Sequence, residues 1–362
     1  MKNRFAGLCQ LLALTLVACF CLSALAVAAD HATEPNVRPR YVVLPPKPAS
    51  PNQPAGNLET WNGSFTYNGT NYPYVMVGAN PSSGNAAEIT NYIIPVKIVL
   101  SNGDVYDPLA GGTTSPLSRT ILSPIFDHTT DYNQGGTDLG TTQYEDAFQR
   151  GNFWSLVQGS NYHILLGGPS SHISVLPELT LNVPSADGHE GAPFGFTVAE
   201  VDINYFDGQI SNYMAQNASI NPTLFPMFIV ANTYLTEGGC CIGGYHSANG
   251  QQSYGMFDYD THPGVFSQDV SALSHEDGEW IDDPLTNGGN GTPCGILEVG
   301  DPLEGGSNGH PYGTWPYVLH GFTYHLQDLV WLRYFGAPAN TSANSWWTFQ
   351  NYPYTQICQQ GS

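Results

Sequence analysis

Histidine and carboxylate side chains lie close together in one short segment, Ser274-His275-Glu276-Asp277-Gly278-Glu279-Trp280. His275 and Glu279 are four residues apart, so on a helix they project from one face, one turn apart. In H-E-x-x-H helices, two histidines bind zinc and the glutamate beside the first activates water. Glu279 stands here at the second ligand position. The spacing therefore predicts that His275 and Glu279 bind a metal ion and that Glu276 acts as a general base.

A second acidic pair, Glu298 and Asp301, follows this segment, and Glu298 comes 19 residues after Glu279. The arrangement resembles that of the gluzincins, the thermolysin-like metallopeptidases, in which a third-ligand glutamate follows the helix at about this distance. The resemblance implies that Glu298 is the third ligand and that Asp301 supports the ligand histidine. It also implies that Tyr324 and His325 face the metal from the far wall and take part in catalysis.

Two further expectations concern the same site. His246 is predicted to be a further ligand, to support the ligands from behind, or to donate a hydrogen bond to a developing oxyanion; the alternative is an ordinary loop histidine. One imidazole with two carboxylates is a harder ligand set than two imidazoles with one carboxylate, so we expect zinc, with another divalent metal as the alternative. An exposed acidic helix, on which His275 only bonds a carboxylate, is the interpretation without a metal.

A more specific resemblance covers a larger part of the chain. The pattern H-E-x-x-E at His275–Glu279, with Glu298-x-x-Asp301 after it, is similar to the pattern of EXORDIUM-like (phosphate-induced) plant proteins. A group of secreted bacterial proteins of unknown function shares more of the sequence. The segments that carry this similarity are Gln143–Trp154, Cys240–Ser247, Leu273–Pro284 and Leu297–Leu303. The resemblance assigns no reaction.

The amino terminus predicts export. Lys2 and Arg4 precede an apolar run, and Val27-Ala28-Ala29 offers small residues for cleavage before Asp30. This pattern is typical of a signal peptide over residues 1–29, so we expect a secreted, periplasmic or extracellular protein without stable membrane insertion after cleavage. Lipoprotein anchoring at Cys19 is a minor alternative. The net charge of −21 would repel phosphate backbones, which excludes nucleic acid as a partner.

Four cysteines remain after residue 29, namely Cys240, Cys241, Cys294 and Cys358. An even number in an oxidising compartment predicts two disulfides. A bond between the neighbours Cys240 and Cys241 is disfavoured, because an ordinary disulfide joins Cα atoms about 5.5 Å apart. We therefore expect Cys294 to pair with Cys240 or Cys241.

The expected strands and helices around these residues indicate an α+β, zincin-like fold. Residues 30–57 are rich in proline and are expected to form an extended arm or linker. Residues 58–266 are expected to form a β-rich subdomain, with a hairpin at Asn68-Gly69 and a buried strand over Asn91–Leu100. Residues 267–362 are expected to carry the metal-site helix, capped by Asp269, and a second packing helix over about Thr323–Tyr334.

These features favour a secreted metal-dependent hydrolase, specifically a zinc metallopeptidase that acts on an extracellular peptide or polymer. Two alternatives stay open at this point. Aromatic residues make up 12% of the chain and carboxylates are numerous, which suits a glycan-active or glycan-binding protein. In a non-catalytic module, the same metal site would only brace the fold.

Overall fold

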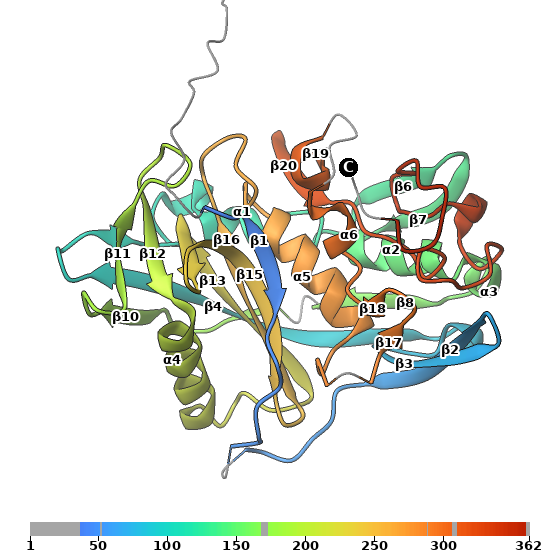
Figure 1. The fold of residues 1–362 in the computed structure, drawn as a ribbon, viewed down its shortest axis with the longest axis horizontal. Coiled ribbons are helices and arrows are strands. Elements are labelled where there is room, and N and C mark those ends of the chain that lie inside the picture. The colour runs from blue at the N-terminus through green and yellow to red at the C-terminus, as the bar shows by residue number, and fades with distance from the viewer. Residues whose placement is uncertain (1–36, 51–52, 168–172, 288, 306–309, 360–362) are drawn as a thin grey trace, which may run out of the picture. The chain divides into compact units, whose positions relative to one another are not determined.

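The computed structural model describes residues 37–50, 53–167, 173–287, 289–305 and 310–359. All of these residues belong to one compact unit. Figure 1 shows a curved mixed sheet with α4 and α5 packed against it. The helices are α1 Pro116–Ile121, α2 Tyr144–Asn152, α3 Trp154–Val157, α4 Ile203–Gln216, α5 Ser271–Asp282 and α6 Asp301–Glu304. None of the described helices is long and apolar enough to cross a membrane.

The main sheet follows the order β10-β4-β13-β16-β15-β14-β12-β11, and β1, β5, β8 and β9 pair at its sides. Its strands are β1 Arg40–Val43, β4 Ala86–Leu100, β5 Val105–Tyr106, β8 His163–Leu166, β9 Ile173–Val175, β10 Leu179–Val183, β11 Gly188–Gly191, β12 Val198–Asp202, β13 Leu224–Ala231, β14 Thr233–Thr236, β15 Cys240–Asn249 and β16 Gln252–Tyr259. β4 pairs in parallel with β13, and β13 with β16, whereas β15 runs antiparallel to β16.

Smaller two-stranded ribbons surround the main sheet. They are β2 Thr60–Tyr67 with β3 Thr70–Val77, β6 Thr130–Gln134 with β7 Thr137–Thr142, β17 Gly291–Thr292 with β18 Gly295–Ile296, and β19 Thr314–Leu319 with β20 Phe322–Gln327. The predicted hairpin is confirmed: β2 and β3 are antiparallel, and Asn68 and Gly69 both have positive φ. A tight hairpin turn requires that conformation at both central residues.

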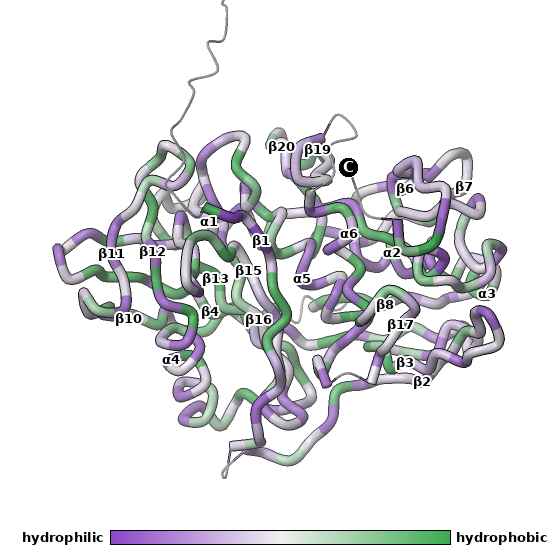
Figure 2. Tube along the Cα trace, in the orientation of Figure 1, coloured by the Kyte–Doolittle hydropathy of each residue, from purple (hydrophilic) through white to green (hydrophobic). Residues whose placement is uncertain are grey.

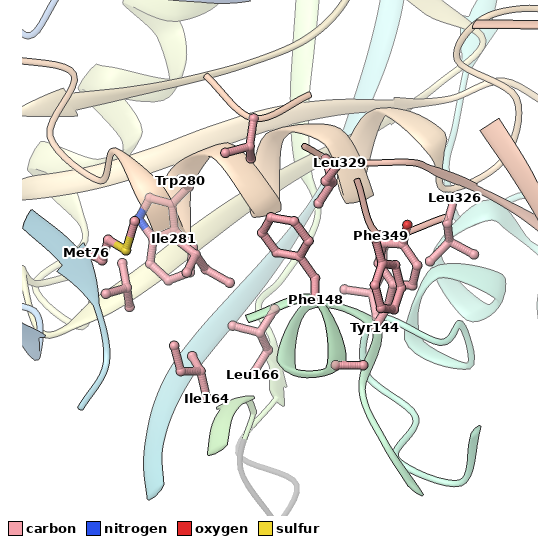
Figure 3. Close-up of a cluster of buried hydrophobic side chains, with 14 of the residues drawn as sticks. Met76, Tyr144, Phe148, Ile164, Leu166, Trp280, Ile281, Leu326, Leu329 and Phe349 are labelled. Carbon is pink, nitrogen blue, oxygen red and sulfur yellow. The ribbon is translucent and has the colours of Figure 1, made fainter. Parts of the chain in front are cut away.

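Both faces of β13 are buried, because α4 covers one face and α5 the other. Phe225, Met227 and Ile229 belong to the core that contains Trp280 and Ile281 of α5. Figure 3 shows this core between α5, α2 and β3. Alternate residues of β13 belong to the second core, with Phe206 and Ile210 of α4. This alternation follows from the two-residue period of a strand and fixes α5 firmly against the sheet.

The α+β class is confirmed, but the prediction of a second packing helix is wrong. Residues 322–327 form strand β20, and turns follow from Leu332. His320 and Gly321 both have positive φ and connect β19 to β20 as a hairpin. The apolar spacing around Leu326 and Leu329 fits a helix, but the alternation of Tyr324 and Leu326 fits a buried strand as well. The turn chemistry at His320-Gly321 decides between them.

The segment expected to be an arm differs in part from its prediction. It is extended, as expected, but β1 pairs in parallel with β15 and becomes part of the sheet. Tyr41 is buried, and its hydroxyl donates to the Phe266 carbonyl at 2.6 Å. Beyond β1, the amides of Leu44 and Lys47 donate to carbonyls of β15. The proline-rich composition therefore suggests a linker where the chain in fact forms a strand beside α5.

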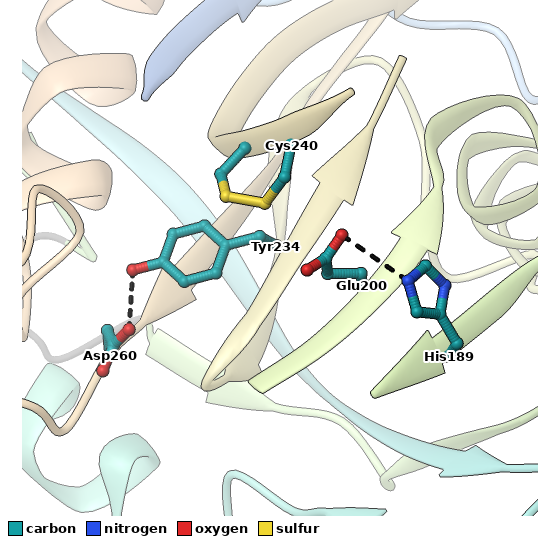
Figure 4. Close-up of a disulfide and its surroundings, with 6 residues drawn as sticks. His189, Glu200, Tyr234, Cys240 and Asp260 are labelled. Carbon is teal, nitrogen blue, oxygen red and sulfur yellow. Dashed lines mark hydrogen bonds and ion pairs between the residues drawn. A yellow bond between two sulfur atoms is a disulfide. The ribbon is translucent and has the colours of Figure 1, made fainter. Parts of the chain in front are cut away.

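The expected cysteine pairing is wrong. Cys294 pairs with Cys358, and their Cα atoms lie 5.3 Å apart. Cys240 and Cys241 are bonded to each other at the start of β15, as Figure 4 shows. Ordinary disulfide geometry disfavours a bond between neighbours, but in the fold Cys240 and Cys241 pair with each other and not with Cys294. Cys358 reaches the loop that carries Cys294.

Candidate metal centre

The predicted helix is confirmed as α5, and all twelve of its residues are buried. Figure 2 shows that this internal helix is largely hydrophilic. Asp269 does not cap it: its carboxylate accepts from the amides of Val270 and His325 instead. A buried helix with so many carboxylates needs compensating partners, because burying an unpaired charge costs several kcal/mol.

Glu279 lies at the centre of two histidine–carboxylate groups. Its Oε1 atom is 3.1 Å from Nε2 of His275, one turn earlier on α5. Its Oε2 atom is 3.9 Å from Nδ1 of His246, which lies on β15. His246, Glu276 and Glu279 offer ligand atoms within 4.8 Å of one another, and so do His275, Glu279 and Asp301. A short-range motif on α5 thus meets a strand and a downstream loop.

The loop and α6 bring the remaining carboxylates. Asp301 Oδ1 lies 3.8 Å from Nε2 of His275, and Glu298 Oε2 lies 4.0 Å from Nε2 of His246. The amides of Gly300 and Asp301 donate to Oε1 of Glu279 at 3.1 and 3.2 Å. These two bonds fix the loop against α5, so that Glu298 and Asp301 both approach the histidines.

His246 is a central member of the site. Its Nδ1 lies 2.8 Å from Oε2 of Glu276, and both side chains are fully buried. Gly244 makes room for this pair, since a Cβ there would come within 3.1 Å of the Glu276 side chain. Burial by itself lowers the pKa of His246, but the carboxylates of Glu298 and Glu276 outweigh it and raise the pKa to about 9.

Several polar atoms at the site are buried without a hydrogen-bond partner among the described residues. They include Nε2 of His246, Nδ1 of His275 and Oε1 of Glu276. Burial and the neighbouring acids raise the pKa values of Glu279 and Glu298 well above the usual range. Buried polar atoms are normally satisfied. A cation bound among these nitrogen and oxygen atoms would satisfy them and allow the carboxylates to ionise.

The ring of His275 is held between two elements that sequence reasoning did not connect with it. The Tyr41 ring from β1 lies 4.2 Å from the His275 ring, centroid to centroid. On another side, a Cβ at Gly300 would come within 2.4 Å of His275 Nδ1. The run Tyr41-Val42-Val43-Leu44 carries a strand signal that could have placed Tyr41 in the sheet.

Tyr324 and His325 are not brought to this cluster. Tyr324 is buried on β20, where its ring lies 4.7 Å from that of Phe322. His325 Nδ1 lies 2.6 Å from a carboxylate oxygen of Asp269. Among the described residues, no hydrogen bond or ion pair joins either side chain to the metal-ligand candidates. Their expected catalytic part depended on a helix that does not form.

An open cleft of about 380 Å³ gives access to the cluster. Glu298 and Asp301 line it together with Glu304 of α6, Tyr334, and Arg38 and Arg40 from the β1 segment. The side chain of Asp301 is 52% exposed, whereas the other members of the cluster are nearly inaccessible. A ligand in the cleft would therefore meet Asp301 and Glu298 first, with the histidines behind them.

Comparison with protein-family models, with curated proteins and with solved structures gives no match for this chain. The resemblances to EXORDIUM-like proteins and to gluzincins therefore stay predictions from the motifs. What the site can do must be argued from its own geometry.

Proposed function

We propose that this protein is a secreted, zincin-like metal-dependent hydrolase, specifically a peptidase, with Glu276 as the general base. The observation that carries the proposal is the convergence on Glu279 of two imidazoles and three other carboxylates, with buried donor and acceptor atoms left unpartnered. Contact between carboxylates and imidazoles suits a metal site better than it suits the paired acids of a glycosidase.

The donors fit a divalent metal ion. His275 and Glu279 would supply a nitrogen and an oxygen, and the third ligand would be an oxygen of Asp301 or Glu298. Asp301 lies 3.8 Å from Nε2 of His275, and Glu298 lies 4.0 Å from Nε2 of His246. Imidazole nitrogen and carboxylate oxygen are ordinary zinc ligands, and the excess of oxygen also suits other divalent ions. When bound, such an ion polarises a carbonyl group and lowers the pKa of water.

Side chains of the protein would accept and donate the protons. Oε2 of Glu276 is held by His246, while Oε1 has no hydrogen-bond partner among the described residues and is free to take a proton from water. The water oxygen adds to the peptide carbonyl carbon, the C–N bond breaks, and Glu276 delivers the proton to the leaving amine. His246 would keep the Glu276 carboxylate oriented through both transfers.

Glu276→Gln tests this assignment, because it keeps the side-chain shape and removes the base. We expect the variant to keep its metal content and melting temperature, and to lose about 10²–10⁴-fold in peptide hydrolysis. Elemental analysis, melting with and without a chelator, and cleavage of a peptide library measure the three properties. Glu298→Gln and Asp301→Asn, assayed alongside, identify the third ligand by their loss of metal.

Two results would overturn the proposal. If the chelator changes neither melting temperature nor metal content, no metal site exists at α5. If Glu276→Gln cuts peptides as fast as wild type, Glu276 is not the base. A wild-type protein that binds metal and cuts no peptide would instead be a non-catalytic module braced by the ion.

A further inference from the structure

Two arginines line the cleft beside the candidate metal centre in an otherwise acidic protein. The chain has nine Lys and Arg residues against 30 Asp and Glu residues, and two of the nine, Arg38 and Arg40, line this one cleft. Both lie in the β1 segment, whose backbone is bonded into the sheet through Cys240 and Cys241 of β15. The positions of the two arginines are therefore set by the fold.

Within the described part of the chain, ion pairs do not use all the hydrogen-bond donors of either guanidinium group. Arg40 reaches the carboxylate of Glu237 at 3.2 Å through one terminal nitrogen, and Glu237 is 63% exposed. The Nε atom of Arg40 is buried without a partner among the described residues. The Arg38 side chain is exposed and makes no ion pair within the described part of the chain. Surface pairs such as Arg40–Glu237 are weak, about 0–1 kcal/mol, so a better anion can replace Glu237.

Carboxylates line the same cleft. They belong to Glu298, Asp301 and Glu304, and the first two are candidate metal ligands. Burial raises the pKa of Glu304 to about 7, while the Tyr41 amide donates to its carboxylate at 2.8 Å. A ligand in the cleft could therefore contact both the candidate metal ligands and the two guanidinium groups. That combination suits a molecule that carries a carbonyl group and an anion.

We infer that the cleft binds the end of a peptide with a free carboxylate, which Arg38 and Arg40 recognise, next to the bond that the metal centre would cut. This rests on the proposed function. Arginine forks bind carboxylates through paired, charge-assisted hydrogen bonds. The cleft volume, about 380 Å³, lies near the lower end of the range of about 300–1,000 Å³ for small-ligand sites, which suits a chain end better than a long polymer.

The test compares an N-acetylated tripeptide that has a free C-terminal carboxylate with the same tripeptide as its C-terminal amide. A third peptide, an amide with glutamate as its last residue, distinguishes a terminal carboxylate from a side-chain one. Binding is measured by calorimetry on zinc-loaded full-length Glu276→Gln protein, which should not turn the peptides over. We expect the free acid to bind about 10–100-fold more tightly than the plain amide.

Arg38→Gln with Arg40→Gln should abolish this preference, and the Lys pair should restore part of it. Arg119→Gln is the matched control, because Arg119 lies over the Phe322 ring and outside the cleft. Equal affinity for acid and amide, or a preference that survives loss of both arginines in a protein of unchanged melting temperature, would overturn the inference. Tight binding of the glutamate amide alone would assign the pair to an acidic side chain instead of the chain end.

Cleavage by wild type separates the two proposals. If wild type cuts acid and amide equally fast, the peptidase assignment stands and the carboxylate subsite falls. If wild type cuts neither peptide, yet the binding preference depends on Arg38 and Arg40, the subsite stands and the hydrolase assignment falls.

Discussion

Glu279 connects the two halves of the site through a single side chain. One oxygen faces His275 and accepts from two loop amides, and the other faces His246. Packing of the neighbouring residues positions the side chains of the site as much as charge does. His275 is fixed between the Tyr41 ring and the backbone at Gly300. A ligand held by packing has its rotamer set before the ion binds, which raises affinity.

Gly300→Ala tests this packing. Gly300 has φ −88°, which alanine tolerates, so the backbone is not strained. The new Cβ would come within 2.4 Å of His275 Nδ1 and would push the ring from its position. We expect metal affinity to fall about 10–100-fold, in line with other losses of ligand support. Competition titration against a metal-sensitive dye measures the affinity.

Gly305→Ala is the matched control for this substitution. Gly305 has φ −90°, and a Cβ there meets no atom of the described residues within 4 Å. We expect its metal affinity to equal that of wild type. If Gly300→Ala also binds metal like wild type, then His275 is not held as a ligand from that side.

At the scale of elements, α5 supplies the motif and its neighbours complete the site. β15 contributes His246, β1 contributes Tyr41, and the segment after α5 contributes Glu298 and Asp301. In its described part, that segment has little regular structure: the short ribbon β17–β18 and the single-turn helix α6. The Cys294–Cys358 disulfide ties it to the end of the chain. The bond therefore constrains the loop that presents the candidate acidic ligands, Glu298 and Asp301.

Replacing both Cys294 and Cys358 by serine should destabilise the protein and weaken metal binding. The disulfide joins residues 64 apart, and closing a loop of that length is worth about 4 kcal/mol in the chain-entropy model. We expect the free energy of unfolding in urea to fall by up to that amount, and metal affinity to fall with it. Unchanged metal affinity in the folded double variant would show that the backbone bonds to Glu279 hold the loop without the disulfide.

At the scale of the whole molecule, acidic groups inside the core make stability depend on pH. Glu145 of α2 faces Asp277 and Asp282 of α5 in a buried group separate from the cleft. Burial raises the pKa of Asp282 to about 8, although Gln149 donates to one of its oxygens. In the unfolded chain the same carboxyl titrates near 4. Folding therefore opposes its ionisation.

Asp282 contributes most to the stability of the fold at low pH. Below about pH 4, Asp282 is protonated in both states, and its contribution to stability is fully present. As the pH rises towards about 8, only the unfolded state ionises, and the free energy of unfolding falls. Asp282→Asn removes this titration, so the variant should be more stable than wild type at pH 8 by several kcal/mol, at about 1.4 kcal/mol per pKa unit.

Urea unfolding between pH 4 and pH 8 in the presence of a chelator measures this dependence. The exposed Asp131→Asn variant is the control, and its curve should run parallel to that of wild type. An Asp282→Asn curve that is also parallel to wild type would mean that Asp282 is ionised in the folded protein.

Features that local rules control could be predicted from the amino-acid sequence. The spacing of His275, Glu276 and Glu279 required only one helical turn, and the Asn68-Gly69 hairpin required only two positive φ values. The buried strand predicted over Asn91–Leu100 also follows from local pattern, and it lies within β4, which ends at the same residue. Such features depend on residues within about four positions of one another, and backbone geometry fixes them wherever the segment lies.

Contacts between residues far apart in the chain could not be predicted and are known from the folded structure. His246 reaches Glu276 across 30 residues, and Tyr41 reaches Glu304 across 263. The pairing of Cys294 with Cys358 and the inclusion of β1 in the sheet are of the same kind. No local period encodes them, because they depend on which faces of the sheet α4 and α5 cover and on which edges remain to be paired. The helix motif could therefore be predicted from the sequence. Its contact with His246, and the cleft that Arg38 and Arg40 line beside it, depend on packing between segments far apart in the chain.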